Sequence, residues 1–458
     1  MNFDVMNFRG KRALVVGAGK SGLAVSRFLA GKGADVVLAD SGDPVFPGEE
    51  LEKLKTMGIE IVRGGYPEVE RGSFDLVVMS PGVPLTAVPA RQARKCGIPV
   101  TGELELAFNF THAPVIAVTG TNGKTTTTAL IGEIFKDAGW NTLVGGNIGL
   151  PLIDEVEKYG PGDAVVAEVS SFQLETADSF KPRVGIILNI TPDHLDRHVT
   201  MENYIGAKAR IFINQDAGDF TVLNYDNDLT ASLAGKTPGR TVFFSRLAKL
   251  REGVYVRDGR ITVNLDGVET CVCRTDELGI PGAHNLENAL AAVAAAKAMG
   301  IENGSLAKTL RRFAGVPHRL EFVAEINGVK YVNDSKGTNP DASIKALEAY
   351  REPIVLIAGG KNKGSDFGEF ADKVKEKARV LVVLGQSAQL IAEAAKARGF
   401  ENIRYAGGFE EAVYLAHRAA RPGEIVLLSP ACASWDMFKS FEERGELFKK
   451  LVSGLKSQ

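Results

Sequence analysis

A run of glycine, lysine and threonine residues has the types and spacing needed to hold the phosphates of a nucleotide. It follows the apolar, β-branched stretch 115–118 and reads Thr119-Gly-Thr-Asn-Gly-Lys-Thr-Thr126. Glycines let backbone amides converge on an anion, and a helix expected from Lys124 to Lys136 adds unpaired N–H groups at its start. Lys124 supplies a positive charge and Thr125 a hydroxyl for Mg²⁺, so ATP is the expected ligand.

The match to the phosphate-loop pattern is incomplete. Val118 stands where the strict pattern has its first glycine, although strand, glycine turn, Lys-Thr pair and helix follow in the required order. The alternative is an ordinary strand-to-helix turn that contains a lysine. The residues of this loop expected to contact ATP are Gly120, Thr121, Asn122, Gly123, Lys124, Thr125 and Thr126.

A second glycine turn, Gly17-Ala-Gly-Lys-Ser-Gly22, lies near the start of the chain. A strand is expected over 13–16 before it, a helix over 23–31 after it, and Asp40 follows the next strand, 35–39. This is the dinucleotide fingerprint and, taken alone, it predicts an NAD-dependent oxidoreductase. The same turn can also hold another diphosphate at the helix N-terminus, or simply pack a strand against a helix.

The composition is that of an ordinary globular protein, and 458 residues are too many for one core. Charged residues make up 24% of the chain and the formal net charge is −2, without a Lys/Arg-rich block, so no nucleic-acid partner and no membrane insertion are expected. Residues 1–11 lack the apolar core of a signal peptide, which favours a cytoplasmic protein. The four cysteines form no disulfide framework, and Cys271-Val-Cys273 lacks the second pair that a metal site would need.

Strands and helices alternate along most of the chain, which predicts three α/β domains in a row. The expected domains are a Rossmann-like domain over 1–102, a P-loop ATPase-like domain over 103–315 and a Rossmann-like domain over 316–458. After Lys208 the pattern changes to short strands and turns, with a hairpin at Asp258-Gly259. The central domain is therefore expected to carry a small antiparallel addition.

Four polar residues follow the expected strands of the central domain. They are Asn147, Glu168, Ser170 and His194. Because the carboxyl ends of parallel strands face the ligand, these side chains are expected to converge on the phosphates. Glu168 is then a candidate Mg²⁺ ligand. For His194, in Asp193-His-Leu-Asp196, the alternative is a capping turn before the next helix.

Seven motifs, taken together and in order, resemble those of the Mur ligases of bacterial cell-wall synthesis. They are Thr119-Gly-Thr-Asn-Gly-Lys-Thr-Thr126, Gly145-Gly-Asn-Ile-Gly149, Glu168-Val-Ser-Ser-Phe-Gln-Leu-Glu175, Asp193-His-Leu-Asp196, His284-Asn285, His318-Arg319 and Asn333-Asp-Ser-Lys336. The resemblance covers nearly the whole chain. Asp334-Ser-Lys-Gly-Thr-Asn-Pro340 and Ser429-Pro-Ala-Cys-Ala-Ser434 are similar to the versions found in the family member that adds D-glutamate.

The resemblance implies an ATP-dependent ligase of peptidoglycan synthesis. Its substrates would be UDP-N-acetylmuramoyl-L-alanine, held through its UDP by the first domain, and D-glutamate. The products would be an amide, ADP and phosphate, formed through an acyl phosphate, and the enzyme is expected to act as a monomer. Three alternatives stay open: another ligase of the superfamily, such as a folylpolyglutamate synthetase, the NAD-dependent oxidoreductase, and an ATP-binding module without catalysis.

The resemblance also assigns roles to single residues. Catalytic roles fall to Lys124, His194, Lys208 and Lys336. Two Mg²⁺ sites would involve Thr125, Glu168, His194 and Lys208, the last as a carbamate. Further ATP contacts would be Asn285, Asn288, Arg319 and Asp334. The UDP-linked substrate would contact Lys20, Ser21, Asp40, Ser41, Gly82, Asn147 and Ser170, and D-glutamate would contact Thr338, Lys363, Ser434 and Phe441.

Overall fold

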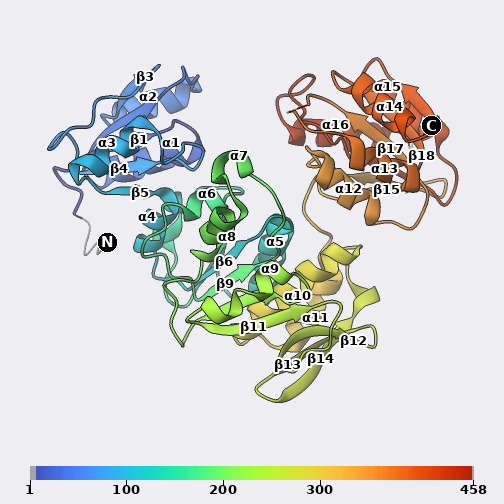
Figure 1. Cartoon of the computed structure of the whole chain (residues 1–458), viewed down its shortest axis with the longest axis horizontal. Helices are drawn as coiled ribbons and strands as arrows, with labels where there is room; N and C mark the ends of the chain where they lie inside the picture. Colours follow the sequence, from blue (N-terminus) through green and yellow to red (C-terminus); the bar gives the residue numbers. More distant parts are fainter. Residues whose placement is uncertain (1–6, 363, 456–458) are drawn as a thin grey trace. The chain divides into compact units, whose positions relative to one another are not determined.

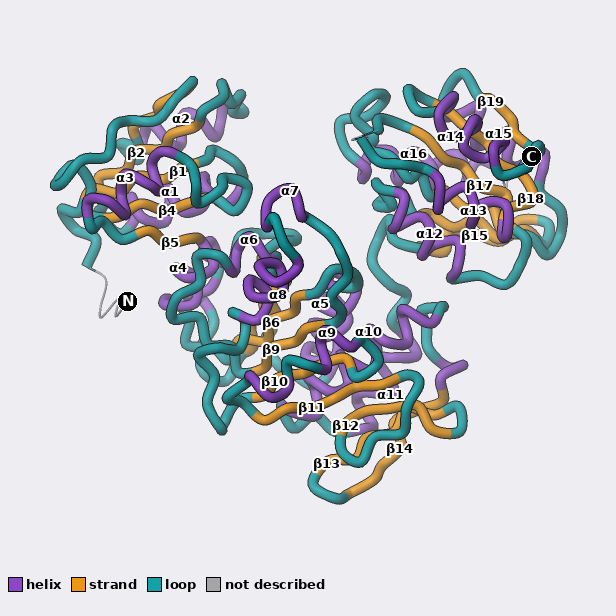
Figure 2. Tube along the Cα trace, in the orientation of Figure 1, coloured by secondary structure: helices purple, strands orange, loops and turns teal. Residues whose placement is uncertain are grey.

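The computed structural model describes residues 7–362 and 364–455. The chain forms two compact units (Figures 1 and 2). The first comprises the chain up to Glu277 together with Glu287–Arg311, and the second comprises Leu278–Leu286 and the chain from Arg312 onward. The first unit contains two β-sheets and the second contains one. The predicted fold class, three α/β domains with parallel-rich sheets, is confirmed.

The first sheet has five parallel strands in the order β3-β2-β1-β4-β5. The strands are β1 (Arg12–Val16), β2 (Asp35–Asp40), β3 (Glu60–Arg63), β4 (Leu76–Met79) and β5 (Val100–Gly102). The helices between them are α1 (Lys20–Gly31), α2 (Gly48–Thr56) and α3 (Val88–Cys96). Strand β4 is a run of four buried apolar residues, as expected of a strand covered on both faces.

The second sheet has nine strands in the order β14-β13-β12-β11-β10-β9-β6-β8-β7. The strands are β6 (Val115–Thr119), β7 (Thr142–Gly146), β8 (Ala164–Glu168), β9 (Val184–Ile187), β10 (Phe220–Asn224), β11 (Arg240–Ser245), β12 (Gly253–Arg257), β13 (Arg260–Leu265) and β14 (Val268–Arg274). The helices that accompany it are α4 (Glu103–Phe110), α5 (Lys124–Asp137), α6 (Ser171–Leu174), α7 (Leu195–His198), α8 (Met201–Ala209), α9 (Asp228–Ala231), α10 (Ala283–Ala298) and α11 (Asn303–Arg312).

The antiparallel addition is smaller than the sequence indicated. Strands β12, β13 and β14 pair antiparallel, and the hairpin turn at Asp258-Gly259 has φ of +48° and +69°. That geometry confirms the predicted hairpin. Strands β10 and β11, however, pair parallel with the main sheet. The reason is burial on both faces, since Thr221, Val222 and Leu223 of β10 are all completely buried.

The third sheet has six strands in the order β15-β16-β20-β17-β18-β19. The strands are β15 (Glu321–Ile326), β16 (Val329–Asn333), β17 (Ile354–Gly359), β18 (Ala378–Leu384), β19 (Ile403–Tyr405) and β20 (Ile425–Leu428). Strand β15 pairs antiparallel with β16, and the other neighbours pair parallel. The accompanying helices are α12 (Pro340–Glu348), α13 (Gly368–Lys377), α14 (Ala388–Ala397), α15 (Phe409–Ala419) and α16 (Phe441–Leu455).

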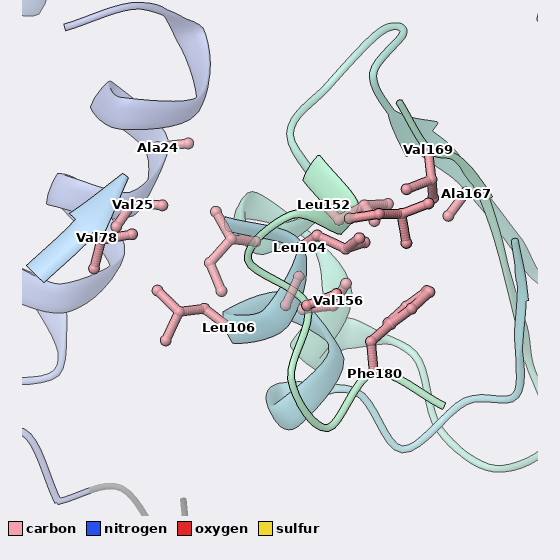
Figure 3. Packing of buried hydrophobic residues seen from close by; sticks show 14 of the residues in the cluster. Ala24, Val25, Val78, Leu104, Leu106, Leu152, Val156, Ala167, Val169 and Phe180 are labelled. Carbon is pink, nitrogen blue, oxygen red and sulfur yellow. The ribbon is translucent and has the colours of Figure 1, made fainter. Parts of the chain in front are cut away.

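The two sheets of the first unit share one hydrophobic core (Figure 3). Val25 of α1 belongs to the same buried cluster as Leu104 and Leu106 of α4 and as Leu152 and Val156 beyond β7. Burying one such side chain contributes about 1.5–3 kcal/mol relative to leaving it exposed. The core therefore fixes the first sheet against the second.

Polar contacts reinforce this junction. Arg27 of α1 donates from Nη2 to Asp154 Oδ2 at 3.1 Å, and Lys32 donates to Glu157 Oε1 at 2.5 Å. Within 7–362 and 364–455, no helix has the length and apolar character required to cross a membrane.

A buried carboxyl group lies in the first turn of α4. Glu103 accepts a hydrogen bond at Oε1 from the Ile153 backbone N–H at 3.0 Å, while its buried Oε2 has no partner among the described residues. Burial raises the pKa of Glu103 to about 7. The folded state consequently favours the protonated form of this group.

We expect the Glu103→Gln variant to lose part of the pH dependence of stability. Because the folded-state pKa of about 7 exceeds the unfolded value of about 4.3, the folded state binds more protons between these values, and stability falls as pH rises through that window. Gln keeps the shape without a charge. Thermal unfolding from pH 4.5 to pH 8 should show a smaller decrease in Tm for the variant than for the natural chain, and equal decreases would contradict the assignment.

Glu105 is the matched control on the same helix. Its carboxylate accepts hydrogen bonds from the backbone N–H groups of Asp178, Ser179 and Phe180 at 2.7–3.1 Å. Replacing this carboxylate by an amide removes an acceptor that these donors share. Glu105→Gln should therefore lower the Tm across the range instead of flattening its dependence on pH.

Candidate nucleotide site

The predicted phosphate loop joins the end of β6 to the start of α5. Gly120 has φ of +153° and Gly123 has φ of +86°, conformations that side chains disfavour. A Cβ atom on Gly123 would lie 2.2 Å from Oδ1 of Asn288, so this position also has no room for a side chain. Strand, glycine turn and helix thus occur where the sequence predicted them, with α5 beginning at Lys124.

Neighbouring segments brace the loop. The Asn122 backbone N–H donates to Asn189 Oδ1 at 2.8 Å, and Asn189 Nδ2 donates back to the Asn122 carbonyl at 3.1 Å. The Thr121 backbone N–H donates to the Asn189 carbonyl at 3.0 Å. From α10, Asn288 Oδ1 accepts a hydrogen bond from the Thr127 hydroxyl at 3.2 Å. The loop is therefore shaped in advance, which suits electrostatic stabilisation of phosphates.

Two lysines share one carbonyl of the loop. Lys124 Nζ donates to the carbonyls of Gly120 and Thr121 at 3.0 and 2.9 Å, and Lys208 Nζ donates to the same Gly120 carbonyl at 2.9 Å. Lys208 is only 1% exposed. Burial first, and the charge of Lys124 second, hold the pKa of Lys208 well below its usual value.

Glu168 presents a buried carboxylate oxygen beside this loop. It ends β8 at the register position opposite Val118 of β6, and it is 2% exposed. Asn147 Nδ2 donates to Oε1 at 2.8 Å, whereas Oε2 has no hydrogen-bond partner in the described part of the chain. A buried carboxylate oxygen without a donor fits a cation, and carboxylate with a hydroxyl such as that of Thr125 fits Mg²⁺. No cluster of three or more His, Cys, Asp or Glu that could hold a metal occurs in 7–362 and 364–455.

His194 and Ser170 begin helices near the same edge. His194 is the N-cap of α7, has φ of +53°, and keeps nearly half of its side chain exposed. Its ring centroid lies 4.9 Å from that of Phe172. Ser170 caps α6, because its Oγ accepts from the Gln173 backbone N–H at 3.2 Å while Gln173 Oε1 accepts from the Ser170 N–H. Both residues thus shape helix starts.

The glycine turn of the first sheet is tied to β2. The Asp40 carboxylate accepts hydrogen bonds from the backbone N–H groups of Ala18 at 2.8 Å and Gly42 at 2.9 Å. The Ser80 hydroxyl donates to the Gly17 carbonyl at 2.8 Å. The predicted substrate contacts at the carboxyl ends of β1, β2 and β4, or directly after them, are Lys20, Ser21, Asp40, Ser41 and Gly82.

In the second unit, Asp334 lies buried after β16. The Ser429 hydroxyl donates to its Oδ2 at 2.6 Å and the Leu320 backbone N–H donates to its Oδ1 at 3.3 Å. Burial raises the pKa of Asp334 to about 7, against the effect of Ser429 and the nearby charge of Arg319. Asn285 of this unit is 6% exposed and donates to the Pro281 carbonyl at 2.7 Å.

A fully buried arginine holds two loops of the second unit together. Arg444 donates from Nη2 to the Ser335 carbonyl at 2.8 Å and to the Cys432 carbonyl at 3.3 Å. Burial lowers its pKa to about 10. These contacts link the loop that carries Lys336 and Thr338 to the loop that carries Ser434.

The remaining residues that the sequence predicts for the site of this unit are Lys336, Phe441, Ser434 and Lys363. Lys336 Nζ lies 5.7 Å from the ring centroid of Phe441, and Ser434 is 2% exposed. Lys363 lies outside the described residues. The sequence does not indicate the roles of Arg444, Asn189 and Arg197, because no local pattern distinguishes a polar residue that anchors another segment from one that faces solvent.

A phosphate loop in the central sheet, with Rossmann-like sheets before and after it, defines a three-domain α/β nucleotide-binding protein. Three family descriptions match successive parts of the chain: Mur ligase MurD-like, N-terminal domain, over 11–102; Mur ligase middle domain, over 118–296; and Mur ligase, glutamate ligase domain, over 318–432. The chain belongs to the Mur ligase family.

Relatives match over nearly full length. The chain is 72% identical over 450 residues to UDP-N-acetylmuramoylalanine–D-glutamate ligase of Pelotomaculum thermopropionicum, covering 98% of this chain and 99% of the relative. It is 49% identical to the Thermoanaerobacter pseudethanolicus enzyme of the same name and 46% identical to that of Clostridioides difficile, covering 98% of this chain and 100% of each relative.

Solved structures share the fold. UDP-N-acetylmuramate-alanine ligase MurC from Thermotoga maritima matches with a TM-score of 0.60 at 22% identity, covering 97% of this chain and 100% of that one. MurF from Acinetobacter baumannii also gives 0.60, at 17% identity, covering 97% and 93%. MurF from Thermotoga maritima, in complex with ADP, gives 0.57 at 16% identity, covering 98% and 97%.

Proposed function

We propose that this protein is the ATP-dependent ligase that joins UDP-N-acetylmuramoyl-L-alanine to D-glutamate in peptidoglycan synthesis. The structural observation that carries the proposal is the buried Oε2 of Glu168, which lies beside a braced phosphate loop and has no hydrogen-bond partner among the described residues. The name shared by full-length relatives that are 46–72% identical supports the choice of substrates.

The proposed division of labour follows the three sheets. Residues 1–102 would bind the UDP of the substrate, residues 103–315 would bind ATP, and residues 316–458 would bind D-glutamate. The tied glycine turn at Gly17–Gly22 supports the first assignment, because a diphosphate fits the N-terminus of α1. The loop held by Arg444 supports the third.

The chemistry requires activation of a poor electrophile. The alanyl carboxylate attacks the γ-phosphorus of ATP with loss of ADP, and the D-glutamate amine then attacks the acyl phosphate with loss of phosphate. Both steps gather negative charge at one place, so positioning and electrostatic stabilisation supply most of the catalysis. Lys124 would stabilise the phosphates during both steps. Mg²⁺ bound by Thr125 and Glu168, and a second ion at His194, would neutralise phosphate charge.

We also propose that Lys208 carries a carbamate. Its ammonium would otherwise be buried and share the Gly120 carbonyl with the ammonium of Lys124. Attack of the neutral amine on CO₂ forms an N–C bond and releases one proton to solvent. The resulting carbamate replaces this repulsion by attraction and provides carboxylate-type oxygens for a cation. Lys336 is assigned to the amino-acid step, together with Thr338, Lys363, Ser434 and Phe441. Because ATP and a UDP-sugar are intracellular metabolites, we propose that the protein is cytoplasmic. We also propose that it acts as a monomer.

The decisive experiment measures phosphate release from ATP with UDP-N-acetylmuramoyl-L-alanine as acceptor. D-glutamate is compared with L-glutamate, L-lysine, meso-diaminopimelate and no amino acid. Release that requires D-glutamate and yields the matching UDP-linked dipeptide is the expected result. Release with another amino acid would favour a sister ligase. No release, combined with nicotinamide binding, would favour the oxidoreductase alternative.

A further inference from the structure

Helix α7 places three side chains around one aromatic ring. His194 at the N-cap, and Arg197 and His198 within the helix, all contact Phe172 of α6. The guanidinium carbon of Arg197 lies 4.3 Å from the centroid of the Phe172 ring. Arg197 is 15% exposed, so its position is set by packing rather than by solvent.

The guanidinium of Arg197 reaches the first sheet. Nη1 donates to the Pro81 carbonyl at 2.8 Å, and Nη2 donates to Glu175 Oε2 at 2.6 Å and to the Val83 carbonyl at 3.4 Å. Glu175 balances the charge and also lies 3.6 Å from His198 Nδ1. The planar fork of an arginine can make these contacts together, and a lysine cannot.

The turn that Arg197 contacts packs directly on the glycine turn of the first sheet. Within it the Val83 N–H donates to the Ser80 carbonyl at 2.9 Å, and the Ser80 hydroxyl donates to the Gly17 carbonyl at 2.8 Å. A Cβ on Gly17 would lie 2.9 Å from both Ser80 Cβ and Val83 Cγ2. A continuous line of contacts therefore runs from the His194 turn through Arg197 to the Gly17 turn.

We propose that Arg197 is a positioning residue that aligns the diphosphate turn of the first sheet with the His194 end of the nucleotide site. This inference rests on the proposed function. Arg197 contacts the Pro81 and Val83 carbonyls and so fixes the position of the turn that packs on Gly17. Loss of Arg197 should weaken binding and alignment of the UDP-linked substrate while the braced phosphate loop continues to bind nucleotide.

The test compares Arg197→Ala and Arg197→Lys with the natural chain. For Arg197→Ala we expect the KM for UDP-N-acetylmuramoyl-L-alanine to rise about tenfold and kcat to fall several-fold, because misalignment of about 1 Å has effects of this order or larger. The Kd for ADP, measured by calorimetry, should change by less than about twofold. Arg197→Lys should be intermediate, since it keeps a charge near Glu175 without the fork.

Arg183 offers a matched control in the same unit. Its Nη1 lies 3.3 Å from Asp219 Oδ1, and its guanidinium carbon lies 5.6 Å from the centroid of the Phe220 ring. Arg183 directly precedes β9, however, so it lies at the end of the strand opposite to the candidate site. Arg183→Ala should leave both constants unchanged. Glu175→Gln should raise the same KM by a smaller factor, and its effect should not add to that of Arg197→Ala.

Two outcomes would overturn the inference. One is an unchanged KM in folded Arg197→Ala and Arg197→Lys; the other is a parallel loss of ADP affinity, which would indicate general disruption. The affinity for UDP alone distinguishes failure of the inference about Arg197 from failure of the proposed function. If the natural chain shows no ligase activity, the Kd for UDP still has to rise in the Arg197 variants relative to Arg183→Ala. If Arg197→Ala does not fold, Arg197→Lys and Glu175→Gln provide the decision.

Discussion

The Lys124→Ala variant is expected to fold normally and to lose phosphate release by about a thousandfold, as is typical when one charged group that stabilises a transition state is removed. Lys124 is the first residue of α5, and its Nζ lies against the carbonyls of Gly120 and Thr121, where phosphates would be held. Alanine favours the helix, so the fold should not suffer. Phosphate release, with circular dichroism as the check on folding, measures the effect.

Lys136 provides the control within the same helix. It lies in the last turn of α5 and pairs with Glu133 at 3.3 Å on the surface. Lys136→Ala should keep full turnover, because an exposed i, i+3 pair contributes little. Near-normal turnover in folded Lys124→Ala would show that the loop holds no reacting phosphate.

The second large effect is expected from Lys208. Preparations depleted of CO₂ should lose most of their activity and regain it on addition of bicarbonate, because the carbamate would be lost and then reformed. With ¹³C-labelled bicarbonate, NMR should show one carbamate resonance that is absent from Lys208→Ala. Lys208→Ala itself should be inactive at any bicarbonate concentration, since alanine provides neither an amine nor oxygen ligands.

Lys297 tests whether the resonance is specific. Its Nζ also donates to a backbone carbonyl, that of Ile301 at 3.0 Å, but the side chain is only partly buried and lies in α10. Lys297→Ala should keep both the resonance and the bicarbonate response. Full activity without bicarbonate, together with the absence of a resonance, would refute the carbamate.

Local patterns predicted the parts of the site that lie within one turn of the chain. The phosphate loop was predictable because strand, glycines and Lys124 are adjacent in sequence, and the hairpin at Asp258-Gly259 because that dipeptide favours its turn. The dipeptide Asn327-Gly328 favours the same type of turn. In the structure it connects the antiparallel strands β15 and β16, with φ of +51° and +75°. This second hairpin was therefore equally predictable from its dipeptide.

Contacts between distant segments were not predictable. Arg197 and Pro81 are 116 residues apart, and Arg444 and Ser335 are 109 apart. Nothing in the residues around either arginine indicates that it contacts a distant segment, because arginine is usually exposed. The parallel pairing of β10 and β11 was missed for a similar reason, since short strands separated by turns are also typical of antiparallel sheets.

The shared core of the first unit has a consequence for folding autonomy. The apolar faces of α1 and α4 are covered by one another and by the segment around Leu152 and Val156. A fragment that ends at Gly102 would lack α4, the segment around Leu152, and Phe110, whose ring centroid lies 4.8 Å from that of Phe28 of α1. The apolar surface uncovered on α1 would make the fragment prone to aggregation. The first two sheets should accordingly melt in one cooperative transition, although we propose a separate ligand for each.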